Sequence, residues 1–209
     1  MIKLFIFDWD GTLWESPKIF HYFSEFQKKF RKQKKLSEKE KKEILERLKK
    51  QKIFLQRKRS IESFIYSIIM LIFHEHPKKG SIELINFLKE RGKKVAIFTD
   101  ARKERVLLAL KKYNIKVDYL VTTREIKNFK PSNLGIELLL FATNTKRKEA
   151  VMIGDSKEDM LAAKASRIKS IAVCDGFGKE EELKLLSDFS FKNLYSFYTW
   201  LKRKKFLNL

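Results

Sequence analysis

The chain has little of what marks secreted, membrane-spanning or low-complexity proteins. Its 209 residues include one cysteine, three prolines and seven glycines, and no low-complexity linker is evident. The single cysteine, Cys174, excludes a disulfide within the chain, which fits a reducing cytosol, and its apolar surroundings predict a buried free thiol. The longest apolar stretch, 61–73, contains Glu62 and is too short to span a bilayer. We therefore expect no membrane partner, no signal peptide and a cytoplasmic location.

Negative charge is also scarce, because 47 Lys and Arg face 26 Asp and Glu and leave a formal net charge of +21. Residues 28–59 alone hold 16 basic residues against 4 glutamates. The simpler interpretation is a solvated helical face. The alternative is an electrostatic footprint for nucleic acid or another polyanion, which is possible but not favoured. The basic run 202–205 allows the same two interpretations.

Apolar runs alternate with segments of helical periodicity along most of the chain. The predicted elements are a strand at 4–7, a helix at 82–88, a strand at 95–98, a helix at 102–112, a strand at 119–121 and a strand at 150–153. Strand followed by helix, repeated along a chain, is typical of parallel sheets built through right-handed crossovers. The predicted fold class is therefore α/β, a Rossmann-like doubly wound parallel sheet.

One long segment does not follow this alternation. Residues 15–78 show helical periodicity throughout, which predicts a helical cap domain on a core made of 1–14 and 79–209. A capping box, Ser37 with Glu40, predicts the start of one of its helices. The apolar stripes expected for the cap are Ile19, Phe20, Phe23, Phe26 and Phe30; Ile44, Leu45 and Leu48; and Ile61, Phe64, Ile65, Ile68, Ile69 and Ile72. The interval 100–130 is too short to hold a second cap.

Four short motifs at the ends of predicted strands carry most of the polar chemistry, and an apolar strand directly precedes three of them. They are Asp8-Trp9-Asp10-Gly11-Thr12, Thr99-Asp100, Lys130-Pro131 and Gly154-Asp155-Ser156-Lys157-Glu158-Asp159. Open parallel sheets bind ligands beyond the carboxyl ends of their strands. A turn at Gly11 lets Asp8 and Asp10, two residues apart, face one centre. Each motif alone is a common turn or helix cap, but their order at strand ends indicates one phosphate-handling site.

On these motifs the chain resembles the haloacid dehalogenase superfamily, in its phosphatase branch near the phosphoglycolate phosphatases, over nearly its whole length. The resemblance implies that Asp8 is a nucleophile and Asp10 the general acid and base. It implies that Lys130 neutralises the nucleophile and the transferring group. The phosphate-binding residues are then expected to be Thr99, Asp100 and Lys130.

The same resemblance implies a magnesium cofactor. Asp8, Asp155 and Asp159 would supply carboxylates to the metal site, and Asp10 its backbone carbonyl. We expect Asp155 to contact the ion directly and Asp159 to act through water. Independently of the resemblance, these four carboxylates together would repel a phosphate dianion, so a divalent cation and Lys130 are needed to offset their charge.

The leading hypothesis is a magnesium-dependent phosphatase that hydrolyses a small phosphate monoester through an aspartyl-phosphate intermediate. Dehalogenases of the superfamily lack the second aspartate, so Asp10 favours phosphoryl transfer. One alternative keeps the site but passes the phosphoryl group to a second hydroxyl, as phosphomutases do. Another is a polyanion-binding protein whose site is vestigial or serves nucleic-acid ends. The sequence names neither the substrate nor the oligomeric state.

Two features near the ends of the predicted cap remain open. The run His74-Glu75-His76 resembles a metal site, but it lacks companion ligands, and we interpret it as a surface linker. Trp14 either contacts the substrate or anchors the hinge by packing.

Overall fold

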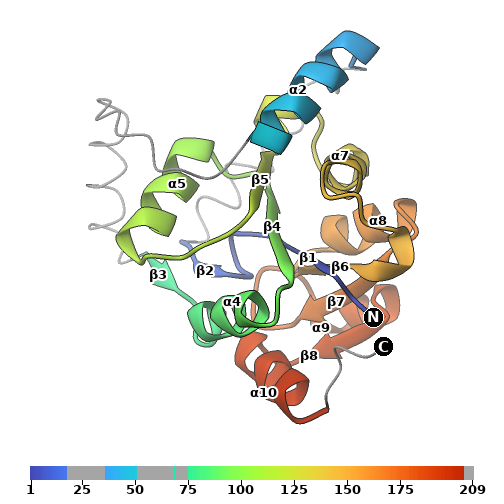
Figure 1. Cartoon of the computed structure of the whole chain (residues 1–209). Coiled ribbons are helices and arrows are strands. Elements are labelled where there is room, and N and C mark those ends of the chain that lie inside the picture. The colour runs from blue at the N-terminus through green and yellow to red at the C-terminus, as the bar shows by residue number, and fades with distance from the viewer. Residues whose placement is uncertain (18–35, 51–67, 69–74, 205–209) are drawn as a thin grey trace.

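The protein is built on one parallel sheet (Figure 1). A computed structural model describes residues 1–17, 36–50, 68 and 75–204. Its six-stranded sheet has the order β5-β4-β1-β6-β7-β8. The strands are β1 (Leu4–Phe7), β4 (Lys94–Thr99), β5 (Tyr119–Thr122), β6 (Ala150–Gly154), β7 (Lys169–Val173) and β8 (Phe189–Phe191). All five pairings are parallel, which confirms the predicted doubly wound α/β fold.

Helices cover both faces of the sheet, because each central strand is apolar on both sides. The larger helices of the core are α4 (Ser81–Glu90), α5 (Lys103–Lys112), α7 (Leu134–Ala142), α8 (Lys157–Ala165) and α10 (Leu194–Lys204). Phe5 and Phe7 of β1 point into the cluster shared with α4, α5 and α10. Leu4 and Ile6 point into the cluster shared with α7 and α8. Because side chains alternate between the two faces of a strand, β1 contributes to both clusters of the core.

Shorter elements complete the core. They are α6 (Thr123–Ile126), the 3-10 turn η1 (Arg147–Glu149) and α9 (Glu180–Leu186). The strands and helices predicted between residues 82 and 153 are confirmed, and their ends differ from the predicted ends by at most two residues. The pattern did not predict α6, which is too short to show a helical period. Cys174 follows β7 and is half-buried instead of buried as expected.

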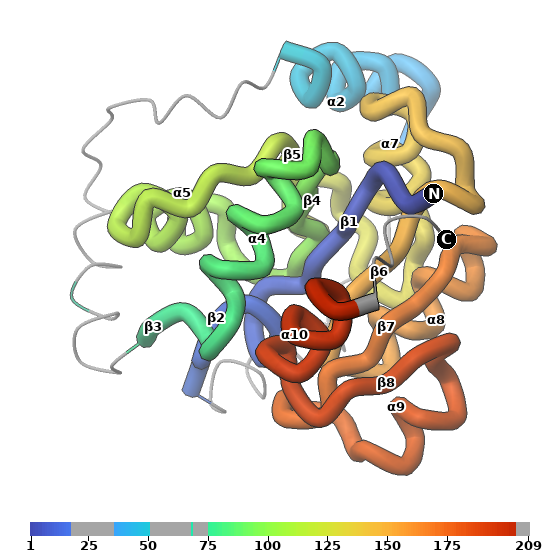
Figure 2. Tube along the Cα trace, turned by 60° about the horizontal axis from the view of Figure 1, so that its bottom comes forward, coloured from blue at the N-terminus to red at the C-terminus, as the bar shows by residue number. Residues whose placement is uncertain are grey.

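The segment predicted to be a cap is described only in part. Helix α2 (Glu38–Lys50) begins at the expected capping box: the Ser37 amide donates to Glu40 Oε2 at 2.9 Å, and the Glu40 amide donates to Ser37 Oγ at 3.2 Å. Leu48 is buried against the cluster on the α7 side of the sheet, and α2 lies beside α7 in both views (Figures 1 and 2). The other two stripes of the predicted cap, apart from Ile68, lie outside the described residues. The division into core and cap stays a prediction.

A small antiparallel ribbon marks where that segment leaves and rejoins the core (Figure 2). Strand β2 (Trp14–Glu15) pairs with β3 (His76–Pro77), so that Trp14 lies opposite Pro77. Trp14 is fully buried and stacks on Trp9, with ring centroids 4.8 Å apart. The packing of Trp14 fits the anchor interpretation. Within the described ranges, no helix is long and apolar enough to cross a membrane.

Candidate active site

The register of the sheet brings the predicted motifs to one edge. Phe7 is level with Ile97 of β4 and with Ile153 of β6, so Asp8, Thr99 and Asp155 all follow at the carboxyl ends of adjacent strands. The Asp8 amide donates to the Ile153 carbonyl at 2.9 Å, which fixes the loop after β1 against β6. This is the edge at which a doubly wound sheet binds its ligand.

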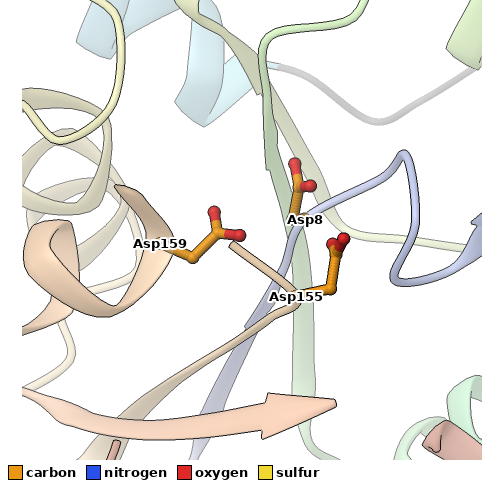
Figure 3. Close-up of side chains that lie close together, drawn as sticks. All are labelled: Asp8, Asp155 and Asp159. Carbon is orange, nitrogen blue, oxygen red and sulfur yellow. The ribbon is translucent and has the colours of Figure 1, made fainter. Parts of the chain in front are cut away.

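Three carboxylates, drawn in Figure 3, and one lysine, Lys130, form the centre of the site, which we call the acidic cluster. Asp8, Asp155 and Asp159 are buried, and one oxygen of each lies within 4.8 Å of the others. Lys130 Nζ donates to Asp8 Oδ1 at 2.6 Å and to Asp159 Oδ1 at 2.7 Å. Lys130 is itself buried, so solvent screens these contacts little.

Asp159 is placed by the start of α8. Ser156 caps this helix: its amide and its hydroxyl both donate to Asp159 Oδ2, at 3.1 and 2.6 Å. The Asp159 amide in turn donates to Ser156 Oγ at 3.3 Å. The helix cap and the acidic motif are thus the same residues.

Asp155 is held from two loops. Thr12 Oγ1 donates to Asp155 Oδ1 at 2.6 Å, and the Phe177 amide donates to Asp155 Oδ2 at 2.8 Å. Gly11 has a φ of +79°, and a Cβ there would lie 2.2 Å from Asp155 Oδ2. Glycine at this position is required both by the left-handed backbone and by the close approach of the carboxylate.

The acidic cluster has three carboxylates for one lysine, and burial together with the neighbouring charges shifts the pKa values of its groups. Burial, with the charges of the neighbouring aspartates, raises the pKa of Asp8 well above its usual value. Burial and the charge of Asp159 raise the pKa of Asp155 to about 7. Burial lowers the pKa of Lys130, but Asp159 and Asp8 outweigh it and raise that pKa well above its usual value.

Such a donor set fits a divalent cation. Carboxylate oxygens are the ligands that magnesium prefers, and buried like charges this close are unfavourable without a counter-ion. Asp8, Asp155 and Asp159 are therefore the residues that could hold a metal. The side chain of Asp10 lies outside the group of three, which leaves only its backbone carbonyl for the role implied by the resemblance.

Asp10 is bound elsewhere. Arg105 Nη1 donates to Asp10 Oδ1 at 2.7 Å, and Ser16 Oγ also donates to this oxygen. Arg105 further pairs with Glu75, whose side chain is fully buried and also accepts from Trp14 Nε1 at 2.9 Å. We call Asp10, Ser16, Glu75 and Arg105 the arginine cluster. Glu75 was expected in a surface linker, which is wrong, because it is buried as the partner of Arg105, while His76 is exposed.

The remaining predicted residues surround the acidic cluster. Thr99 is buried, and its Oγ1 accepts from the Ala101 amide at 3.0 Å, which orients the hydroxyl at the end of β4. Asp100 adds to the negative charge that raises the pKa of Lys130. A carboxylate so close repels a phosphate unless it is protonated or contacts the ligand through its backbone.

Sequence reasoning did not find Arg105, Glu75 or the Phe177 amide. Arg105 is one of many basic residues in a lysine-rich chain, and nothing in its spacing distinguishes it. The contact of Phe177 is made by the backbone, so its side-chain type carries no signal.

Comparison with known proteins agrees with this geometry. A family described as haloacid dehalogenase-like hydrolase matches residues 5–173. The pyrophosphatase PpaX of Halalkalibacterium halodurans is 30% identical over 99 residues, which are 46% of this chain and 46% of that protein. The chain thus matches about half the length of this curated relative.

Two solved structures share the fold over nearly their whole length. A predicted phosphoglycolate phosphatase from Haemophilus somnus has a TM-score of 0.68 at 17% identity, with 95% of this chain and 97% of that chain covered. A beta-phosphoglucomutase candidate from Thermotoga maritima has a TM-score of 0.67 at 20% identity, with 97% and 100% covered. At these identities the likeness shows the fold alone.

Proposed function

Because the chain belongs to the haloacid dehalogenase-like hydrolases, we propose that it is a magnesium-dependent phosphatase acting on a small phosphate monoester through an aspartyl-phosphate on Asp8. The observation that carries this proposal is the acidic cluster, in which Asp8 Oδ1 lies 2.6 Å from Lys130 Nζ among three buried carboxylates. A phosphate ester entering this edge of the sheet would meet a carboxylate nucleophile whose negative charge is already partly offset.

In the proposed first half-reaction an oxygen of Asp8 attacks phosphorus, and the bond from phosphorus to the leaving alkoxide breaks. Asp10 gives its proton to that alkoxide. Lys130 stays paired with Asp8 and Asp159 and offsets charge on the transferring group. The Thr99 hydroxyl and the backbone amides after Asp8 donate to the equatorial oxygens.

In the second half-reaction a water attacks the aspartyl-phosphate. Asp10, now ionised, takes a proton from this water, and Asp8 is regenerated as inorganic phosphate leaves. Asp8, Asp155 and Asp159, with the Asp10 carbonyl, would hold a magnesium ion, which when bound supplies positive charge opposite the phosphoryl oxygens.

The proposed substrate is a small phosphorylated compound. Inorganic pyrophosphate is included among the compounds to be tested because curated relatives are pyrophosphatases. The test is a hydrolysis screen over phosphorylated metabolites, pyrophosphate and an aryl phosphate, with magnesium and with excess chelator. We expect release of phosphate from at least one compound, dependent on magnesium and absent in an Asp8→Asn protein prepared in the same way. Full activity in chelator, or in Asp8→Asn, would overturn the proposal.

A further inference from the structure

A buried arginine with two carboxylate partners lies directly behind the proposed acid and base. The Arg105 side chain is only 7% exposed. Its Nε donates to both carboxylate oxygens of Glu75, at 3.3 and 3.0 Å, and its Nη2 donates to Glu75 Oε2 at 2.8 Å. Nη2 also donates to Ser16 Oγ at 2.9 Å, and Nη1 is the group that reaches Asp10. The planar guanidinium is thus fixed on one edge by Glu75 and presents the other to Asp10.

The partners come from four separate parts of the chain. Asp10 belongs to the loop after β1, Ser16 follows β2, Glu75 precedes β3 and Arg105 is on α5. Trp14, itself part of the ribbon of β2 and β3, donates from Nε1 to Glu75 Oε2 at 2.9 Å. The orientation of Asp10 therefore depends on the ribbon that closes the segment between β2 and β3.

Stability alone does not explain this arrangement. Taking a guanidinium and a carboxylate out of water costs as much as their attraction returns, and well-packed apolar residues of similar size are often as stable. A buried guanidinium does fix the geometry of its partners, because its planar N–H groups donate only along set directions.

The contacts on Asp10 are also one-sided. Arg105 and Ser16 both donate to Oδ1. Among the described residues, no hydrogen bond to Oδ2 is recorded, and the Asp10 side chain is 24% exposed. One oxygen is anchored, and the side chain as a whole stays partly exposed.

We propose that Arg105, held by Glu75, is a positioning residue that anchors Oδ1 of Asp10 so that Oδ2 can exchange a proton with the leaving group and the attacking water. The inference rests on the proposed function, because it concerns the acid and base of that reaction. Arg105 acts through Asp10 and does not contact the substrate. Misplacing a catalytic group by about 1 Å can cost ~10²-fold in rate.

The test compares leaving groups. An alkyl phosphate needs protonation of its leaving oxygen, whereas an aryl phosphate needs little, so loss of Asp10 positioning should appear mainly with the alkyl ester. Phosphoenzyme formation in a single turnover isolates this half-reaction. We expect Arg105→Met to slow it by about 10 to 10²-fold on an alkyl phosphate and by less than about 3-fold on an aryl phosphate, with KM little changed. Arg105→Lys, which keeps the charge, should restore part of the rate.

A double-mutant cycle with Asp10→Asn separates positioning from other roles. If Arg105 acts only through Asp10, Arg105→Met should cause no further loss in the Asp10→Asn background. The matched control is Arg147→Gln, which removes an exposed ion pair with Glu137 at 2.6 Å, far from the site. This variant should leave the rate of phosphoenzyme formation unchanged on both the alkyl and the aryl phosphate. Since Arg105→Met leaves Glu75 buried without its main partner, the Arg105→Met/Glu75→Gln protein is the second variant should the first fail to fold.

The outcomes distinguish this inference from the proposed function. Equal losses on alkyl and aryl esters, or a full additional loss in the Asp10→Asn background, would overturn the positioning role while leaving the phosphatase intact. An additional loss seen as a raised KM would instead indicate that Arg105 binds substrate. A wild-type protein that forms no phosphoenzyme on any ester would overturn both.

Discussion

Two buried charge clusters flank the short loop 8–12, and they are built differently. The acidic cluster sets three carboxylates against one lysine, and the pKa values of Asp8 and Asp155 rise because the carboxylates are buried and, to a lesser extent, because they lie beside other aspartates. The arginine cluster sets two carboxylates against one guanidinium, which offers five donors, and Ser16 and Trp14 complete its hydrogen bonds. The first cluster needs positive charge from outside the chain, whereas the second is nearly satisfied within it. The loop 8–12 therefore contributes Asp8 to a cluster suited to bind a cation and Asp10 to a cluster suited to orient a side chain.

The largest expected effect breaks the acidic cluster at Asp8, the proposed nucleophile. Asp8→Asn keeps the size of the side chain, but an amide cannot form the acyl phosphate. We expect turnover to fall by about 10⁴-fold or more while the circular dichroism spectrum is unchanged. Intact mass spectrometry of the wild type after rapid quenching should detect a phosphoryl adduct that the variant lacks. If the variant keeps a tenth of wild-type activity, Asp8 is not the nucleophile.

The next effect removes the only internal cation of the same cluster. Lys130→Gln leaves Asp8 and Asp159 without their buried partner, which should lower the free energy of unfolding by roughly 3 kcal/mol and the rate by about 10²-fold. Urea denaturation in chelator measures the first quantity. The control is Lys3→Gln, which breaks a pair with Glu149 whose lysine is 58% exposed and should cost less than about 1 kcal/mol. Similar losses in the two variants would contradict a special role for Lys130.

A smaller effect concerns pH and metal together. The pKa of Asp155 is about 7 in the folded protein and near 3.8 when unfolded, so the folded state binds the extra proton between these values. The stability from this proton is present at low pH and is lost as pH rises through 7, and the raised pKa of Asp8 acts in the same direction. We expect metal-free protein to melt at lower temperature at pH 8 than at pH 5.

Magnesium should reverse that trend, because the ion binds the ionised carboxylates. The rise in melting temperature on adding magnesium should therefore be larger at pH 8 than at pH 5. In Asp155→Asn both the pH dependence and the magnesium effect should shrink. A metal-free melting temperature that is flat or rises from pH 5 to pH 8, and matches that of Asp155→Asn, would contradict the charge imbalance.

The smallest expected effect lies outside both clusters. Replacing Lys41, Lys42, Lys49 and Lys50 of α2 by Gln should leave the hydrolysis of small phosphate esters unchanged. Fluorescence anisotropy should show only weak binding of duplex DNA at physiological salt in either protein. Tight binding that falls steeply with salt, at a log-log slope of about −0.9 per phosphate contact, and that disappears in the variant would favour an activity at nucleic-acid ends.

The same two clusters show how much of the site could be predicted from the sequence. The acidic cluster was predictable because Asp8 and Asp155 directly follow apolar strands, and a parallel sheet brings strand ends to one edge. Asp8, Lys130, Asp155 and Asp159 meet as expected, although their roles in catalysis and in metal binding stay predictions. The order of strands and helices in the fold sets how far apart these four residues lie in the sequence.

The arginine cluster was not predictable, because its partners meet through a tertiary contact that no local pattern encodes. Glu75 reaches Arg105 only because β3 returns beside β2, and two-residue strands carry too few side chains to show a period. Likewise α2 was recognised as a helix by its capping box, but its periodicity did not say that Leu48 would pack on the α7 side of the sheet. Contacts between segments far apart in the sequence depend on the path of the whole chain, which local sequence patterns do not specify.

The ribbon of β2 and β3 makes the segment between them a replaceable insert. Its two ends are hydrogen-bonded neighbours, with Trp14 opposite Pro77, so the core sees the same two anchor points whatever length of chain connects them. Loop closure adds only about 0.6 kcal/mol for each doubling of that length. Segments of other lengths could thus be grafted between residues 16 and 75 at little loop-closure cost, provided that Glu75 and Ser16 keep their places beside Arg105 and that other apolar side chains replace Leu48 of α2 against the α7 side of the sheet.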